Sequence, residues 1–140
     1  MAQLKLVKKQ NTPYVWDNLR AKYLKLTPEE WVRQHFVHYL IEHINYPKSS
    51  LALEGGLRVN QQAFRTDILI YKNAKPWMIV ECKAPQIKLT QKVLDQASVY
   101  NLNYNTPYIA ITNGLQHFVF QVNQQEKNYS PLNDFPQYVS

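Results

Sequence analysis

Two strand-like segments separated by a short polar stretch constrain the fold of this chain more than any other feature. The first, Phe64–Tyr71 (FRTDILIY), alternates well, and the second, Trp77–Lys83 (WMIVECK), is β-rich and mostly apolar. The five residues between them, Lys72–Pro76 (KNAKP), predict a hairpin loop centred on Ala74. The pattern therefore predicts two antiparallel strands that lie side by side.

This hairpin brings two acidic residues together. Residues two apart in a strand share a face, so Glu81 and Lys83 point one way while Cys82 points the other. If the hairpin is symmetric about Ala74, position i faces position 148 − i, and Asp67 lies directly opposite Glu81. Directly opposed residues have Cβ atoms roughly 4.5–5.5 Å apart. Two carboxylates at that separation repel each other unless a cation lies between them.

Mg²⁺ is the cation that such a pair favours, with Mn²⁺ as a substitute, because Mg²⁺ takes one or two carboxylates and keeps waters and phosphate oxygens. The predicted metal ligands are Asp67, Glu81 and the backbone carbonyl of Cys82. An ammonium group on the same face, that of Lys83, would orient or deprotonate a water or stabilise a phosphorane. This set is suited to metal-assisted phosphodiester hydrolysis. The alternative is a salt bridge between neighbouring strands.

Basic charge is concentrated in two stretches of the chain. Residues 1–27 hold six basic side chains and one acid, Asp17, while the whole chain has a net charge of +6. Residues 58–92 hold seven basic side chains, and their only acids are Asp67 and Glu81. Two carboxylates among so many cations indicate a site for a polyanion and a metal, although a solvated basic surface fits the charge equally well. The predicted DNA contacts are Arg58, Arg65, Lys88 and Lys92.

Helix signals flank the hairpin. Thr27-Pro28-Glu29-Glu30 predicts an N-cap and the start of a helix that runs to about Asn45. A second helix is expected over Gln91–Tyr104, with Thr90 as its N-cap. Besides the hairpin, strands are expected over residues 51–59, 108–112 and 118–122, the last two joined by a turn at Asn113-Gly114. The sequence thus predicts an α/β (or α+β) fold, with a mixed central sheet flanked by helices and the order α-β-β-β-α-β-β.

The chain is expected to form a single domain with three parts. Residues 1–27 are predicted to be a basic and aromatic arm with a short strand near 23–26, residues 28–122 the core, and residues 123–140 an irregular tail. In the arm, Tyr14, Trp16 and Tyr23 alternate with basic residues. This arrangement is compatible with nucleic-acid stacking or with an ordinary packed arm.

Composition excludes several classes of protein. Hydrophobic residues make up 45% of the 140 residues, which excludes a disordered chain. The N-terminus has no apolar signal-peptide core, and the aliphatic runs are too short to cross a membrane. Cys82 is the single cysteine and cannot form an internal disulfide, which is typical of a reducing compartment. We therefore expect a cytoplasmic protein.

Two further residues complete a family pattern. Gln96 and Tyr100 lie one turn apart on the second predicted helix. Together with Asp67 and Glu81-Cys82-Lys83, they resemble the D…ExK…QxxxY signature of PD-(D/E)xK nucleases. The longer stretches LTPEEWVRQHF, FRTDILIY, IVECKAP, QASVYN and IAITNG are similar to the N-terminal nuclease domain of type I restriction-enzyme R subunits, over roughly residues 20–122.

The resemblance implies a restriction-endonuclease-like core and a DNA endonuclease of a restriction-modification system. It implies catalytic roles for Asp67, Glu81 and Lys83, and a role for Gln96 and Tyr100 in contacting DNA or supporting the site. Such families often place an acid on the first helix, and Glu30 is the candidate here, although it equally well stabilises the helix N-terminus. Thr66 stands where the family name has proline, and that position carries no chemistry.

The resemblance has one large departure. R subunits join this domain to an ATP-driven DNA motor, whereas this sequence has no GxxxxGK[ST] loop. We therefore expect DNA cleavage without a motor. The alternatives are a DNA-binding module, or a nuclease subunit that is inactive until a motor or specificity partner joins it. An RNA-directed nuclease and a homodimer are also compatible with the sequence.

Overall fold

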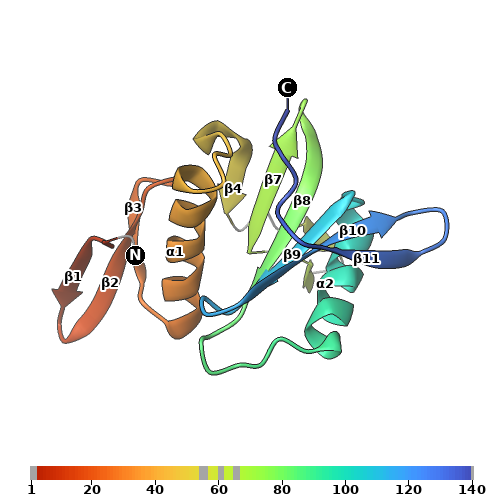
Figure 1. The fold of residues 1–140 in the computed structure, drawn as a ribbon. Coiled ribbons are helices and arrows are strands. Elements are labelled where there is room, and N and C mark those ends of the chain that lie inside the picture. The colour runs from red at the N-terminus through yellow and green to blue at the C-terminus, as the bar shows by residue number, and fades with distance from the viewer. Residues whose placement is uncertain (1–2, 54–56, 60–61, 65–66, 140) are drawn as a thin grey trace.

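A mixed β-sheet forms the centre of the molecule (Figure 1). The computed structural model describes residues 3–53, 57–59, 62–64 and 67–139. Within these residues six strands form the sheet, in the order β11-β10-β9-β8-β7-β4. Strands β8 and β9 are parallel, and the other neighbours are antiparallel, so the predicted mixed α/β class is confirmed. The strands are β4 (Leu51–Leu53), β7 (Ile68–Lys72), β8 (Lys75–Cys82), β9 (Tyr108–Thr112), β10 (His117–Asn123) and β11 (Asn128–Leu132).

The β7–β8 hairpin has the register that the sequence predicts. Ile68 faces Val80 and Ile70 faces Met78, so position i does face position 148 − i in this part of the hairpin. Continuing the register by one residue places Asp67 opposite Glu81. Asp67 itself lies just before the first residue of β7, so it stands at the end of the strand rather than inside it.

The turn of this hairpin is shorter than predicted. Only Asn73 and Ala74 lie between the strands, with φ angles of 53° and 62°, which is the backbone of a two-residue type I′ turn. Such a turn pairs position i with 147 − i, as it does for Lys72 and Lys75. A bulge then shifts the register by one, because Trp77 has no partner in β7. The predicted five-residue loop is therefore wrong, although the register derived from it is right.

Helix α1 (Pro28–Glu42) begins where the sequence predicts. The Thr27 hydroxyl accepts a 3.0 Å hydrogen bond from the Glu30 N–H, and Pro28 occupies the first helical position. The helix ends before the predicted Asn45, which has a φ of 66°. That left-handed backbone is incompatible with continuing a right-handed helix.

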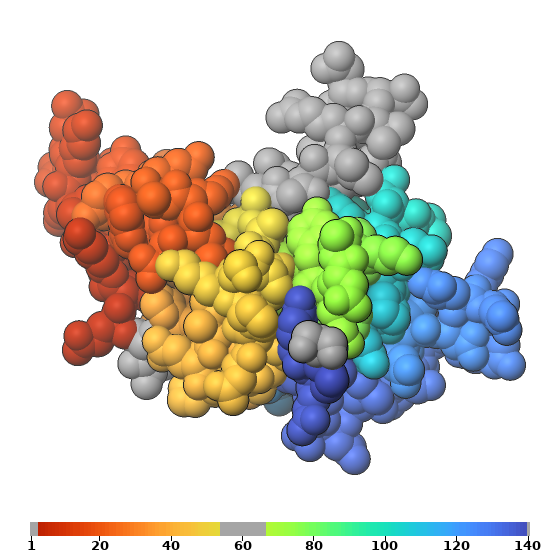
Figure 2. Space-filling model, turned by 90° about the horizontal axis from the view of Figure 1, so that it is seen from above, coloured from red at the N-terminus to blue at the C-terminus, as the bar shows by residue number. Residues whose placement is uncertain are grey.

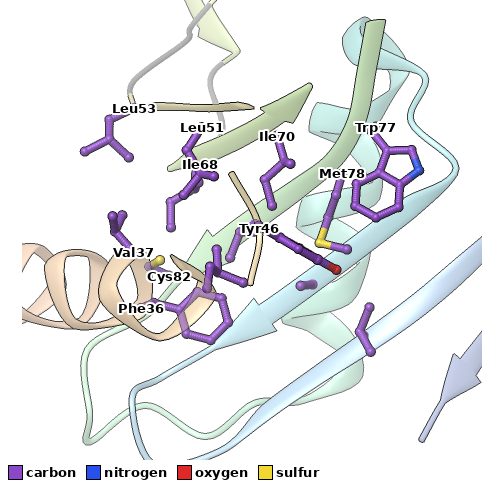
Figure 3. Close-up of a cluster of buried hydrophobic side chains, with 14 of the residues drawn as sticks. Phe36, Val37, Tyr46, Leu51, Leu53, Ile68, Ile70, Trp77, Met78 and Cys82 are labelled. Carbon is purple, nitrogen blue, oxygen red and sulfur yellow. The ribbon is translucent and has the colours of Figure 1, made fainter. Parts of the chain in front are cut away.

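The two helices cover opposite faces of the sheet. Helix α1 packs on the face that carries Ile68, Met78 and Val80, in the larger hydrophobic cluster. Figure 3 shows this cluster, with Phe36 and Val37 of α1 beside Cys82. Helix α2 (Gln91–Tyr104) has the predicted bounds, with Thr90 as its N-cap, and packs on the other face. Alternate residues of each strand therefore reach different helices, as the pleat requires.

The N-terminal residues form more structure than predicted. Instead of an arm with one short strand, strands β1 (Leu6–Lys9), β2 (Thr12–Asp17) and β3 (Lys22–Lys25) make a three-stranded antiparallel sheet beside α1 (Figure 1). Figure 2 shows these residues, in red and orange, gathered at one end of the molecule, with the C-terminal strands in blue at the other. The sequence signal was weak because lysines interrupt the apolar residues of β1 and β3.

The remaining differences concern strand ends. The predicted strand over 51–59 is present as β4 and β5 (Leu57–Val59), and residues 54–56 between them lie outside the described part. The predicted strand over 64–71 is also divided, because β6 (Gln62–Phe64) pairs with β5 and β7 begins at Ile68. The tail predicted to be irregular contains β11, which pairs with β10 at the sheet edge. A 3-10 turn, η1 (Lys48–Ser50), precedes β4.

Candidate active site

The candidate site lies where β7 begins and β8 ends. The backbone N–H of Asp67 donates to the Val80 carbonyl at 3.2 Å. The Asp67 carboxylate accepts a 2.7 Å hydrogen bond from the N–H of Cys82. One residue beyond β8, the Lys83 N–H donates to the Thr112 carbonyl at 2.8 Å and fastens the strand end to β9. The backbone of the sheet therefore fixes the positions of all three predicted catalytic residues.

Glu81 is a buried carboxylate with an unsatisfied oxygen. The residue is 7% exposed, and its Oε2 atom is buried without a hydrogen-bond partner. Burial and the neighbouring Asp67 charge raise the pKa of Glu81 to about 8, and the nearby Lys83 lowers it in part. An unpaired buried carboxylate oxygen is costly unless something binds to it.

Asp67 shares the same environment. Burial raises the pKa of its carboxyl, and the hydrogen bond from the Cys82 backbone and the positive charge of Arg33 oppose that rise. The charge of Asp67 in turn raises the pKa of Glu81. The Asp67 carboxylate accepts its hydrogen bond from the N–H of Cys82, so it lies beside the residue that follows Glu81 in β8.

Lys83 connects the carboxylates to helix α2. Its Nζ atom is 3.7 Å from Oε1 of Glu81 and 3.4 Å from Oε1 of Gln96. Gln96 is exposed at the surface of α2, so the ammonium group lies between the buried acid and solvent. The structure thus brings together four of the residues predicted from sequence, from two strands and one helix.

Two acidic residues begin helix α1 near the candidate site, Glu29 and Glu30. Both oxygens of Glu30 accept from Arg33, and one also accepts from Gln34 at 2.8 Å. It is Glu29 whose negative charge raises the pKa of both Asp67 and Glu81. Glu29 is exposed, whereas Glu30 is occupied within its own helix. The capping pattern treats both glutamates as helix-start residues, so it gave no signal to separate them.

The donor set fits a hard divalent ion. It consists of the buried carboxyl group of Glu81, whose Oε2 has no hydrogen-bond partner, the half-buried carboxyl group of Asp67, and the Cys82 main chain beside Asp67. In the described part of the chain no three His, Cys, Asp or Glu side chains gather closely enough to hold a metal. Two carboxylates are nevertheless enough for Mg²⁺, which retains waters in its remaining positions. The residues present therefore fit Mg²⁺ better than a metal that needs three or four side chains.

A comparison with known protein families identifies the family of this chain. Residues 28–136 match the family described as type I restriction enzyme R protein N terminus. The chain belongs to this family. The matched region of this R protein N-terminal domain runs from α1 through β11 and includes the whole candidate site, while β1, β2 and β3 precede it. Neither the curated proteins nor the solved structures compared with the chain include a match.

The predicted DNA contacts are only partly described. Lys88, in the segment between β8 and α2, and Lys92, in the first turn of α2, are both exposed. Arg58 lies in β5, and its side chain is outside the described part of the structure, as is the whole of Arg65. The first turn of α2 therefore presents one of these cations, Lys92, on the same helix as Gln96, and Lys88 precedes that helix.

Tyr100 and the thiol of Cys82 pack against the hydrophobic clusters on opposite faces of the sheet. Tyr100 is half-buried on α2 and packs against the cluster beneath that helix. The side chain of Cys82 is buried on the α1 side of the sheet, and burial raises the pKa of its thiol well above the ordinary value. A nucleophilic thiol needs the opposite shift. The thiol is therefore a core group, and only the main chain of Cys82 faces the carboxylates.

Two cavities lie away from the carboxylates: the larger is between the end of α1, β10 and residues 132–137, and the smaller is between α1 and the β9–β10 hairpin. Their volumes are about 520 and 350 Å³. Neither is lined by Asp67 or Glu81. The smaller cavity is lined by all four histidines of the chain, which are His35, His38, His43 and His117. The described part of the chain also has no helix long and apolar enough to cross a membrane.

Proposed function

We propose that this R protein N-terminal domain is a Mg²⁺-dependent endodeoxyribonuclease of the PD-(D/E)xK type. Asp67, Glu81 and the Cys82 carbonyl would hold the ion, and Lys83 would act beside it. The family supports a role in restriction, with DNA as the substrate. The observation that carries the proposal is the buried, unpartnered Oε2 of Glu81 next to the half-buried carboxyl group of Asp67, whose charge raises the pKa of Glu81.

An alternative use of the same residues is a structural ion pair between Glu81 and Lys83. Their 3.7 Å separation is long for a strong charge-assisted hydrogen bond, which is normally 2.7–2.9 Å. A structural pair between Glu81 and Lys83 also leaves the buried Oε2 of Glu81 without a hydrogen-bond partner. The arrangement therefore favours a site completed by a further cation.

Each residue has a distinct role in the proposed reaction. A bound Mg²⁺ would polarise the scissile phosphate and lower the pKa of an attacking water. The Lys83 ammonium, which the Gln96 side chain orients, stabilises charge that develops on the phosphate oxygens. The Cys82 N–H fixes the Asp67 carboxylate so that it does not rotate away from Glu81. Exposed Lys88 and Lys92 would contact the DNA backbone.

Incubation with supercoiled plasmid and with single-stranded circles tests the proposal. We expect nicked and linear products with Mg²⁺ or Mn²⁺, none with EDTA, and none from Asp67→Asn. Failure of the wild type to bind either ion, even with DNA present, would end the nuclease interpretation.

A second candidate is a nuclease subunit that waits for a partner. The family description favours it, because it names a part of the R protein of a type I restriction enzyme. The same experiment distinguishes the two. A protein that binds Mn²⁺ and DNA but leaves plasmid uncut would support the partner-dependent subunit, with a motor or specificity subunit as the missing component.

A further inference from the structure

The N-terminal sheet has two faces of different character. On β2, Val15 and Asp17 are fully buried, whereas Tyr14 and Trp16 between and beside them are only half-buried. Alternate residues of a strand point to opposite faces. One face of this sheet is therefore covered at Val15 and Asp17, and the other face is open to solvent. We call the second face, defined by Lys5, Lys9, Tyr14, Trp16, Tyr23 and Lys25, the outer face.

The outer face brings aromatic rings from adjacent strands together. Trp16 pairs with Tyr23 across β2 and β3, and their ring centroids are 5.0 Å apart in an edge-to-face arrangement. Tyr14 lies opposite Lys25 in the next row of the same face. The Nζ atom of Lys5 is 5.3 Å from the centroid of Trp16 and 5.9 Å from that of Tyr23. A lysine is thus already held against the ring surface by cation–π attraction.

Charge on the outer face is of one sign. Lys5, Lys9 and Lys25 are all exposed. Asp17 is the only acid in residues 1–27. It is buried on the opposite face and bonded to Arg20 at 2.7 Å. The cations of the outer face therefore have no carboxylate within their own segment and are complementary to a polyanion.

We infer that the outer face binds single-stranded nucleic acid, with bases stacked on Trp16, Tyr14 and Tyr23 and phosphates near the lysines. Aromatic rings beside cations on an open sheet are the equipment of a stacking platform, since every unpaired base offers a π-face. A duplex hides those faces in its own stack. The surface lies outside residues 28–136 and uses none of the carboxylates, so it is a second contact, separate from the candidate active site.

Fluorescence anisotropy of a labelled oligo-dT in EDTA tests this inference with the full chain, because cleavage cannot occur there. Trp16→Leu and Tyr23→Leu remove the π-faces while keeping apolar bulk in the strands. Each is expected to weaken binding about tenfold. Trp16→Phe restores a ring and should recover most of the affinity. Far-UV circular dichroism and urea unfolding check that each variant is folded. Tyr23 is already 36% exposed, so Tyr23→Leu should remain folded and provide the test even if Trp16→Leu unfolds.

A matched pair of double variants separates a specific face from diffuse attraction. The double variant Lys5→Ser/Lys25→Ser removes two cations from the outer face. The control, Lys8→Ser/Lys22→Ser, removes two exposed cations that the strand register places on the other face of the same sheet. We expect the first pair to weaken oligo-dT binding several times more than the second. Equal losses from the two pairs, tighter binding of a duplex than of oligo-dT or oligo-rU, or unchanged binding in both leucine variants would overturn the inference.

Discussion

The backbone N–H of Cys82 donates a 2.7 Å hydrogen bond to the carboxylate of Asp67. Cys82 stands between Glu81 and Lys83, so the strand that carries two of the site residues also holds the third. The position of the Asp67 carboxylate therefore depends on β8 as well as on the backbone of Asp67 itself. The predicted chemistry depends on this link, because metal ligands must be held in a fixed geometry to bind tightly.

Removal of either carboxylate should sharply weaken metal binding. Asp67→Asn and Glu81→Gln keep side-chain shape and remove one charge each. We expect calorimetric Mn²⁺ affinity to fall at least about tenfold in both and plasmid cleavage to disappear, because one acid cannot replace two as ligands. Asp95→Asn, an exposed acid on α2, is the matched control and should bind Mn²⁺ like the wild type. Wild-type affinity in Glu81→Gln would rule out Glu81 as a ligand.

Lys83→Met should separate metal binding from chemistry. The variant loses the cation 3.7 Å from Glu81 and leaves both carboxylates in place. Mn²⁺ should bind as tightly or more tightly, because a competing positive charge is gone. Cleavage should nevertheless fall by roughly 10²-fold or more, the usual effect of removing a catalytic group. If Glu81 and Lys83 instead form a structural ion pair, Lys83→Met should lower the stability of the fold, and there would be no metal site for it to change. Normal cleavage by Lys83→Met would contradict the proposed function.

The stability of the metal-free protein should fall as pH rises through the range in which Glu81 titrates. Its pKa is about 8 in the folded protein, against an ordinary value of 4.5. Between these values the folded state keeps a proton that the unfolded state has lost, so folding loses up to about 1.4 kcal/mol per pH unit. Urea unfolding in EDTA from pH 5 to pH 8 measures the loss.

Glu81→Gln supplies the reference for this titration. His35 and His117 have lowered pKa values, chiefly through burial, and their contribution changes stability in the opposite direction near their ordinary pKa of 6.5. The difference between wild type and Glu81→Gln removes that contribution. A difference that does not change with pH would show that Glu81 titrates normally.

Gln96→Ala should lower cleavage and leave the fold intact. Gln96 is exposed, and its side-chain oxygen accepts from the Lys83 ammonium at 3.4 Å. Surface substitutions of this kind change stability by at most about 0.5 kcal/mol, while a freely moving Lys83 stabilises developing charge less well. Gln91→Ala, on the same helix but bonded to Asp95, is the control. A large stability loss in Gln96→Ala with normal cleavage per folded molecule would assign Gln96 a structural role.

Asn101→Ala should destabilise the connection between α2 and β9. The Asn101 side chain accepts from the N–H and hydroxyl of Thr106, at 2.9 and 2.8 Å, and donates to the Thr106 carbonyl at 3.2 Å. Thr106 is fully buried, and its hydroxyl can still donate to the Tyr108 carbonyl at 2.7 Å. Loss of the Asn101 bonds to its N–H and carbonyl costs about 1–3 kcal/mol for each group left unpaired. We expect a loss of roughly 3 kcal/mol by urea unfolding. Asn103→Ala, an exposed asparagine of the same helix, should change stability little.

Elements with local signals at both ends could be predicted from the sequence. Helix α2 and strand β9 have the predicted bounds. Thr90 marks the start of the helix, and Asn105, with a left-handed φ of 55°, marks its end. The turn after β9 likewise has Gly114 at a φ of 86° and is closed by hydrogen bonds to the Asn113 side chain. Short-range chemistry of this kind is visible in a single sequence.

Features that depend on tertiary contacts could not be predicted. The N-terminal sheet and β11 are held by pairing with neighbours that no local pattern identifies. The choice between Glu29 and Glu30 depends on how Arg33 and Gln34 pack, which a capping pattern does not include. The site pair was found through a loop whose length was wrong. The bulge at Trp77 compensated for that error.

That bulge makes the length of the segment between the two acids matter more than its composition. With the two-residue turn alone, Asp67 would face Val80 and point toward α1, on the other side of the sheet. The surplus residue at Trp77 returns Asp67 to the side of Glu81. An insertion or deletion of one residue in this hairpin would therefore separate the acids even if every side chain near them were unchanged. Natural or engineered variants of this hairpin should tolerate substitutions in the turn far more readily than changes in the number of residues.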